Sequence, residues 1–161
     1  MAGFDRQDLG HRGLMLLSIH PTHVEKILAG SKTTELRRTR PGVLPGQPVA
    51  IYSTAPTGAV VATCRVERVE RSSLPRLRRN ALGSSCVSSQ EFTRYFDGCD
   101  SGTAIHICDV QALAVPVALS HLRANSKYSP PQTWHFIDEP KLAAMLGNHP
   151  SRRHFDSMFC V

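Results

Sequence analysis

A cluster of ionisable and hydroxyl side chains lies in residues 30–38 (GSKTTELRR). Lys32 is a cation that can contact a phosphate or polarise a carbonyl. Glu35 and Arg37 share one face of a strand, because alternate residues of a strand point the same way. They either pair there as structural polar groups or leave Glu35 to accept hydrogen bonds from a base edge. Side chains of these types, spaced as G-x-K-x-x-E-x-R, can bind an anionic or nucleotide-like ligand where they share a cleft.

Two elements must position this motif. Pro21 and the apolar spacing of Val24 and Ile27 predict a short helix, which Gly30 ends. Residues 32–38 are then expected to form a strand. Lys32 and Glu35 differ in parity along that strand, so both can line one cleft only if Lys32 precedes the regular strand or lies at a bulge.

Further side chains are candidates for the same cleft. Arg38 extends the basic end of the motif and can contact phosphate. Tyr52 and Trp134 are the aromatic residues expected to border the cleft, where a stacked base contributes about 1–3 kcal/mol. Ser53 adds a hydroxyl at a strand end. We therefore predict ligand binding by Lys32, Glu35, Arg37, Arg38, Tyr52, Ser53 and Trp134.

Strands dominate the rest of the chain. Apolar runs bounded by Gly, Pro and polar residues predict strands at residues 13–19, 48–53, 59–69 and 103–116 and a last one ending at residue 136. Ser88 and Glu91 form a capping-box pattern that opens a helix, whose aromatic residues we expect in the core. The predicted fold is mainly β (α+β), a mixed β-barrel with short crossover helices.

The length of 161 residues fits one main domain. We expect residues 1–12 to be a flexible polar leader and residues 13–137 to be the folded domain. Residues 138–161 are expected to be a C-terminal extension with one helical pattern, which ends in polar sequence.

The net charge of +6 favours a polyanionic partner, RNA or another single-stranded nucleic acid. No apolar run approaches the length of about 20 residues that spans a bilayer, so no membrane partner is expected. Five cysteines without a C-x-x-C pattern fit a reducing cytoplasm, with Cys64 and Cys108 in the core and Cys160 exposed. The histidines form no zinc pattern, and we expect no metal and no cofactor.

Three collinear blocks resemble the ASCH domain family, whose fold is similar to the PUA domain of RNA-modification proteins. The first is G-x-K-x-x-E-x-R with the Pro-Gly turn and Ile-Tyr-Ser after it. The second runs from residue 91 to 98 (EFTRYFDG), and the third is the segment PPQTWHF at residues 130–136. Together they cover about residues 14–137. The resemblance implies a PUA-like β-barrel that binds RNA or a nucleotide, with a regulatory role in some members.

The resemblance also implies an alternative function as a hydrolase. One branch, similar to a bacterial acetylcytidine amidohydrolase, uses a lysine, a threonine and a distant glutamate, and other members are ribonucleases. The corresponding residues here are Lys32, Thr34 and Glu35, although Glu35 occupies the place of the threonine in that branch. The distant glutamate would fall near residues 81–85, where no acid lies. A third alternative is a protein-interaction module in which the cleft is vestigial.

Overall fold

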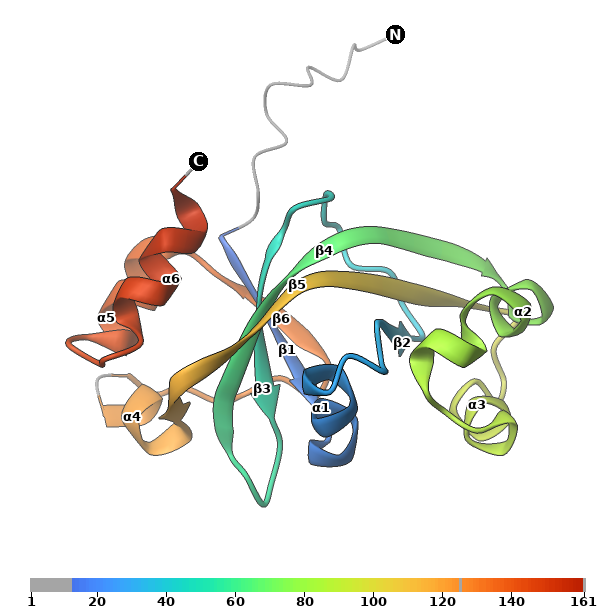
Figure 1. Cartoon of the computed structure of the whole chain (residues 1–161), viewed down its shortest axis with the longest axis horizontal. Coiled ribbons are helices and arrows are strands. Elements are labelled where there is room, and N and C mark those ends of the chain that lie inside the picture. Colours follow the sequence, from blue (N-terminus) through green and yellow to red (C-terminus); the bar gives the residue numbers. More distant parts are fainter. Residues whose placement is uncertain (1–12, 125, 161) are drawn as a thin grey trace, which may run out of the picture.

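The first strand is buried on both of its faces. We describe the protein from a computed structural model, which covers residues 13–124 and 126–160 (Figure 1). Its strands are β1 (Leu14–Ile19), β2 (Thr34–Arg37), β3 (Pro48–Ser53), β4 (Ala59–Ser73), β5 (Ser101–Ala118) and β6 (Trp134–Ile137). Its helices are α1 (Pro21–Leu28), α2 (Leu74–Ser85), α3 (Ser89–Tyr95), α4 (Leu119–Ala124), α5 (Glu139–Leu146) and α6 (Arg152–Phe159).

Alternation along β1 divides the core into two clusters. Leu14 and Leu16 belong to one hydrophobic cluster, whereas Met15 and Leu17 belong to another. Successive side chains of a strand point to opposite faces, so β1 contributes to both clusters at once. This is why its sequence is a continuous apolar run and does not alternate with polar residues.

The six strands form one mixed sheet in the order β2-β5-β4-β3-β1-β6. β1 pairs with β3 in parallel, and the other strand pairs are antiparallel. The α+β class is therefore confirmed. The sheet is not closed into the predicted barrel, since β2 and β6 are edge strands with no ladder between them in the described part of the chain.

Helices cover the two ends of this sheet (Figure 1). At one end α2 and α3 pack with Leu36 and Ala104 in a third hydrophobic cluster. At the other end α5 and α6 contribute Leu142 and Phe155 to the cluster that contains Leu14. Residues 139–159 thus bury apolar side chains against the sheet, while the boundaries proposed for domain and extension stay a prediction. The predicted leader at residues 1–12 lies outside the described residues.

Several elements differ in length or kind from the predicted ones. β3 matches its prediction, and Ser88 and Glu91 form the expected capping box. β4 and β5 are longer than predicted and irregular in register. Cys108 was predicted in the core and this is wrong, because the strand is distorted next to Asp109 (φ 53°) and the Cys108 side chain is exposed. No helix in residues 13–124 and 126–160 is long and apolar enough to cross a membrane.

Candidate functional site

The turn after α1 places the motif lysine. Gly30 has φ 83°, a left-handed conformation that favours glycine, and it reverses the chain at the end of the helix. The backbone amides of Ser31 and Lys32 both donate to the Lys26 carbonyl, each at 3.1 Å. Lys32 therefore lies before the regular strand, which begins at Thr34. This meets the condition under which Lys32 and Glu35 can line one cleft.

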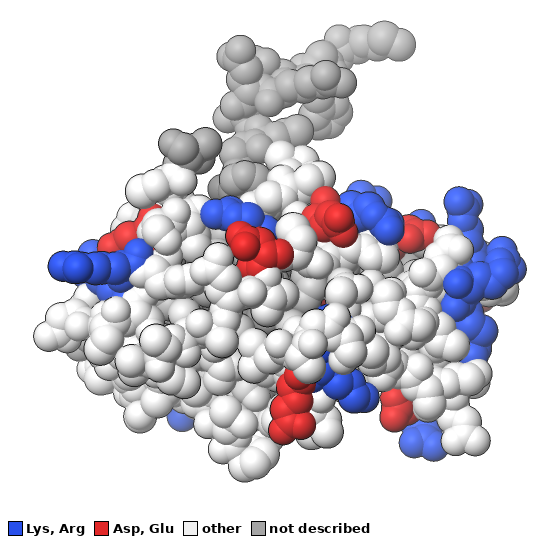
Figure 2. Space-filling view, in the orientation of Figure 1, with Lys and Arg blue, Asp and Glu red and all other residues white. Residues whose placement is uncertain are grey.

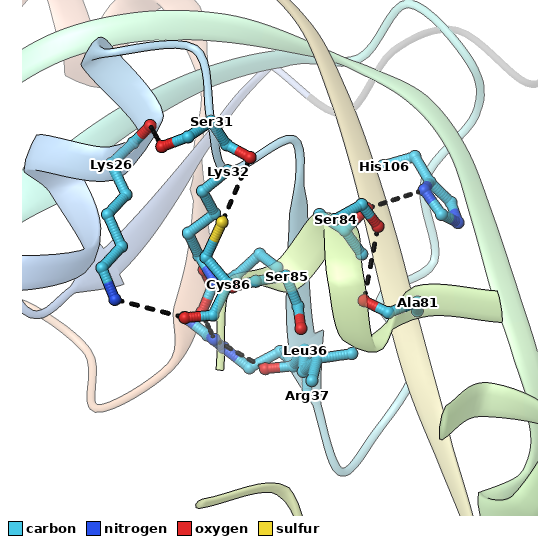
Figure 3. Close-up of polar contacts among 12 residues, drawn as sticks. Lys26, Ser31, Lys32, Leu36, Arg37, Ala81, Ser84, Ser85, Cys86 and His106 are labelled. Carbon is cyan, nitrogen blue, oxygen red and sulfur yellow. Dashed lines mark hydrogen bonds and ion pairs between the residues drawn. The ribbon is translucent and has the colours of Figure 1, made fainter. Parts of the chain in front are cut away.

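The lysine points at the C-terminal end of α2. Its Nζ donates to the Ser85 carbonyl at 2.5 Å, and the Thr33 amide donates to the Ser84 carbonyl at 2.9 Å. The last carbonyls of a helix lack intrahelical partners and carry partial negative charge, so a cation is favourable there. Figure 3 shows this junction, where the Cys86 carbonyl also accepts from Lys26. Lys32 is only 2% exposed, although it carries a charge.

Glu35 lies between the two cations of the motif. Its Oε2 is 3.3 Å from Lys32 Nζ, and its Oε1 accepts from Arg37 Nη1. All three side chains are at least nine-tenths buried. Glu35 Oε2 has no hydrogen bond within the described structure beyond this ion contact. Two cations and one carboxylate leave one excess positive charge in the site.

Arg37 also joins the two edges of the sheet. Its Nη2 donates to the Ser18 carbonyl of β1 at 2.8 Å, and its Nε donates to Thr133 Oγ1 beside β6 at 2.9 Å. A further bond runs from Nη1 to the Leu36 carbonyl at 2.8 Å. The planar guanidinium with its several donors suits such bridging better than an ammonium does. Arg37 therefore holds β2 against β1 across the gap that no strand ladder closes.

A cleft of ≈ 360 Å³ opens above these residues. That volume lies in the range of small-molecule sites. Lys32, Glu35 and Arg37 line it together with side chains from α1, α3 and the segment before β6. The most informative of these additional residues are Ser18, His23, Phe92, Tyr95, Gln132 and Thr133.

His23 and Tyr95 give the cleft a neutral base and an aromatic wall. Burial lowers the pKa of His23, and the nearby charge of Lys32 lowers it further. Its Nδ1 is buried without a hydrogen-bond partner in the described residues. Tyr95 is 36% exposed, and the Arg38 guanidinium lies 5.0 Å from its ring centroid. The site can thus offer a cation, a hydrogen-bond acceptor and an aromatic surface to one ligand.

Thr34 points to the other face of β2. Its Oγ1 bonds with Ser84 Oγ at 2.8 Å and with His106 Nδ1 at 3.0 Å. Glu70 Oε2 lies 3.5 Å from the other nitrogen of that imidazole. Burial lowers the pKa of His106, and the charge of Arg68 adds to this effect. Thr34 therefore belongs to a separate polar chain and does not meet Lys32 in the cleft.

Four other predicted residues lie outside the cleft lining. Tyr52 is buried in the hydrophobic cluster with Leu14, and Trp134 packs against the cluster of Met15. Ser53 is buried at the end of β3. Arg38 donates to the Tyr95 carbonyl at 2.8 Å and so borders the cleft without lining it. The structure brings Lys32, Glu35 and Arg37 together and separates Tyr52, Ser53 and Trp134 from them.

Sequence reasoning missed His23, Tyr95 and Thr133 as cleft residues. Tyr95 was assigned to a core stripe with Phe92 and Phe96, and those two are buried as expected. Residues three and four apart cover a wide arc of a helix, so Tyr95 lies at the edge of the core while Phe92 and Phe96 lie inside it. Thr133 adjoins the PPQ segment that carries the family resemblance, which is a signal that could have identified it.

The described residues contain no group of three His, Cys, Asp or Glu side chains arranged to hold a metal ion. The charged side chains of the cleft lining are Lys32, Glu35, Arg37 and Glu91, and His23 adds an imidazole. The buried group Lys32–Glu35–Arg37 carries one excess positive charge that can bind a phosphate, and the imidazole or a carboxylate can exchange a proton.

Comparison with known proteins points to one family. No family model matches the chain. A protein described as an ASCH domain-containing ribonuclease from Zymomonas mobilis subsp. mobilis is 28% identical over 130 residues, which are 79% of this chain and 87% of that protein.

Solved structures give the same relationship. The crystal structure of ASCH from Zymomonas mobilis has a TM-score of 0.75 at 25% identity and covers 84% of this chain and 94% of that one. The N-terminal domain of Staphylothermus marinus McrB shares the fold alone, with a TM-score of 0.55 at 13% identity over 87% of this chain and 96% of that one. These matches support the assignment of an ASCH domain to this chain.

Proposed function

We propose that this protein binds RNA and that the cleft above Lys32, Glu35 and Arg37 holds one nucleotide of it. The observation that carries the proposal is the buried group of two cations and one carboxylate, which opens into a cleft of ≈ 360 Å³. A ribonuclease relative supports an RNA-related role for the family.

Each of these groups keeps a capacity for hydrogen bonding or stacking that its contacts within the protein do not use. The Lys32 ammonium has three donors, of which one bonds Ser85 and one faces Glu35, so one is left for a phosphate oxygen. Glu35 Oε2 can accept from the amino group of a base. Tyr95 provides the aromatic surface for stacking, a role predicted for Tyr52 and Trp134. Arg37 contributes charge, while most of its donors bond the protein.

The test is binding of a fluorescent single-stranded RNA by wild type, Lys32→Ala and Tyr95→Ala. Loss of a charge-assisted contact at Lys32 is expected to weaken binding roughly tenfold or more. Loss of stacking at Tyr95 is expected to weaken it by about 1–3 kcal/mol. Lys141→Ala is the matched control, because Lys141 is an exposed lysine of α5 outside the cleft.

Tyr95→Ala keeps the test decisive if Lys32→Ala unfolds, since Tyr95 lies at the surface. Circular dichroism identifies a temperature at which each variant is folded, and RNA binding is measured at that temperature. Equal affinity of wild type and the folded cleft variants for RNA would overturn the proposal.

A second candidate function is RNA cleavage, which one contact favours. A lysine-based hydrolase site requires an acid within reach of Lys32, and Glu35 Oε2 lies 3.3 Å away. The neutral imidazole of His23 would take the proton of the 2′-hydroxyl, whose oxygen attacks the adjacent phosphorus, while the 5′-oxygen leaves with a proton donated by the Lys32 ammonium. The threonine that lines this cleft is Thr133, whereas Thr34 bonds His106 on the other face of β2.

Cleavage is tested separately from binding, by product formation from a labelled RNA. Products that require Lys32 and His23 would establish the hydrolase. Tight binding without products in wild type would leave RNA binding as the function.

A further inference from the structure

Helix α2 presents a strongly basic surface next to the cleft. Its sequence, LPRLRRNALGSS, contains three arginines and no acid. Figure 2 shows Lys and Arg side chains gathered at the end of the molecule where α2 and α3 lie. Arg76 and Arg79 are exposed, and neither has a hydrogen bond or ion pair within the described part of the chain. They lie three residues apart and hence on the same side of the helix.

Arg78 is positively charged but fixed by neutral partners. Its guanidinium lies 4.6 Å from the ring centroid of Phe92 and donates to the hydroxyls of Ser89 and Thr93. Within residues 13–124 and 126–160, no carboxylate pairs with Arg76, Arg78 or Arg79. The positive charge of α2 is therefore not neutralised by the protein.

A groove between α2 and α3 connects this charge to the cleft. The groove has a volume of ≈ 620 Å³, and Arg78 and Arg79 line it with one acid, Asp97. Phe92 borders both the groove and the cleft, so only α3 separates them. The width of one helix is about 10 Å. Arg94 is exposed on α3 itself and adds a cation between the two hollows.

We propose that a single strand of RNA, several nucleotides long, runs from the cleft over α3 onto α2, where Arg76 and Arg79 contact its phosphates. This inference rests on the proposed function, and it names the substrate class as an extended single strand and not a lone nucleotide. Polyanion binding explains why a helix would carry three arginines without acids at this position. Single-strand grooves combine such cations with aromatic stacking, which Tyr95 supplies here.

The experiment compares two RNAs and three proteins across a salt series. The RNAs are a labelled single strand of about ten nucleotides, within the usual site sizes of 4–16, and a dinucleotide that fills only the cleft. The proteins are wild type, Arg76→Ala/Arg79→Ala, and Lys127→Ala/Arg153→Ala. The last is a matched control, because Lys127 and Arg153 are exposed cations near α4 and in α6, at the opposite end of the molecule.

For the longer RNA, the α2 double variant is expected to lower the slope of log K against log salt by about 1.4, since each phosphate contact contributes about 0.7. By the same relation its affinity falls roughly 25-fold at 0.1 M salt. Dinucleotide binding is expected to stay at the wild-type value, and the control variant is expected to match wild type with both RNAs.

The outcomes separate this inference from the proposed function. An unchanged slope in the α2 variant, together with weakened binding by Lys32→Ala in the test of the proposed function, would overturn the strand path and leave the cleft. An equal loss of slope in the control variant would also overturn the path, because it would show non-specific charge attraction. If wild type binds neither RNA, both proposals are wrong. Circular dichroism of both double variants confirms that surface substitutions leave the fold intact.

Discussion

Lys32 and Arg37 each serve the fold and the cleft. Lys32 satisfies the end of α2, and Arg37 joins β2 to β1 and to the segment before β6. Both cations are buried because Glu35 and several carbonyl oxygens compensate their charge. A buried ion pair is costly to break from one side, since the remaining charge has lost its partner. The motif therefore has a structural requirement that is independent of any ligand.

This requirement predicts that Arg37→Met destabilises the protein by about 3–5 kcal/mol. The substitution removes the bridge between the sheet edges and leaves the Ser18 carbonyl and Glu35 with fewer partners. Urea unfolding measures the free energy. Arg40→Met is the control, because Arg40 is an exposed arginine near the same strand. A change below about 0.5 kcal/mol, as expected for surface positions, would contradict the bridging role of Arg37.

At the scale of elements, α6 shows how a polar segment can belong to the core. Phe155, Met158 and Phe159 lie three and four residues apart and form one apolar face of the helix. Phe155 is 1% exposed and packs in the cluster with Leu14. The one helical pattern expected in residues 138–161 is that of α5, with Leu142, Met145 and Leu146, and the sequence after it was expected to be a polar end. Residues 152–159 thus contribute to the same core as β1.

Phe155→Ala is therefore expected to lower the free energy of unfolding by about 3–5 kcal/mol, through lost burial and the cavity that remains. Thermal and urea unfolding measure the change. Asp156→Ala removes a neighbouring side chain that is exposed, and it serves as the control. Equal stability of the two variants would show that α6 is only loosely attached to the sheet.

At the scale of the whole molecule, several partly buried histidines link stability to pH. Burial lowers the pKa of His23, His106, His135 and His149 below the ordinary value of 6.5. The unfolded chain then binds more protons than the folded one between each lowered pKa and 6.5. Stability rises with pH wherever the unfolded state binds more protons. These groups therefore favour the folded state above that range and cease to do so as the pH falls through it.

The prediction is a lower midpoint of urea unfolding at pH 5.5 than at pH 7.5, with most of the loss below about pH 6.5. The variant His23→Gln should lose less than wild type over this interval, because it lacks one of the linked groups. A midpoint that is constant or rises as the pH falls would contradict the assignment of these histidines as neutral in the folded protein.

The sequence predicts the sheet better than it predicts the cleft walls. Continuous apolar runs identified β1 and β3, and the capping box identified α3, because each signal is local. The motif spacing also predicted that Lys32, Glu35 and Arg37 lie close together, as they do in the structure. By contrast, the placement of Tyr52 depends on which face of the fully buried strand β3 meets which layer, and that of Trp134 on how the edge strand β6 packs. Periodicity cannot distinguish the two faces when both are apolar.

Helix α2 was likewise predictable only in part. The three arginines within residues 74–79 favour an exposed segment, and the exposure of Arg76 and Arg79 agrees with this. The docking of its C-terminal end on Lys32 is a tertiary contact between distant parts of the chain. No local pattern specifies such a contact.

The cluster that joins β1 to α6 has a consequence for the order of events during biosynthesis. Leu14 and Leu16 emerge from the ribosome early, whereas Phe155 and Met158 emerge among the last of the described residues, and all four share one cluster. At translation rates of about 5–20 residues per second, the β1 side chains wait for seconds before these partners exist. Until translation has passed α6, the nascent chain lacks Phe155 and Met158 and its cluster around β1 is incompletely covered. We therefore expect chaperones that bind exposed apolar segments to recognise the chain at this stage.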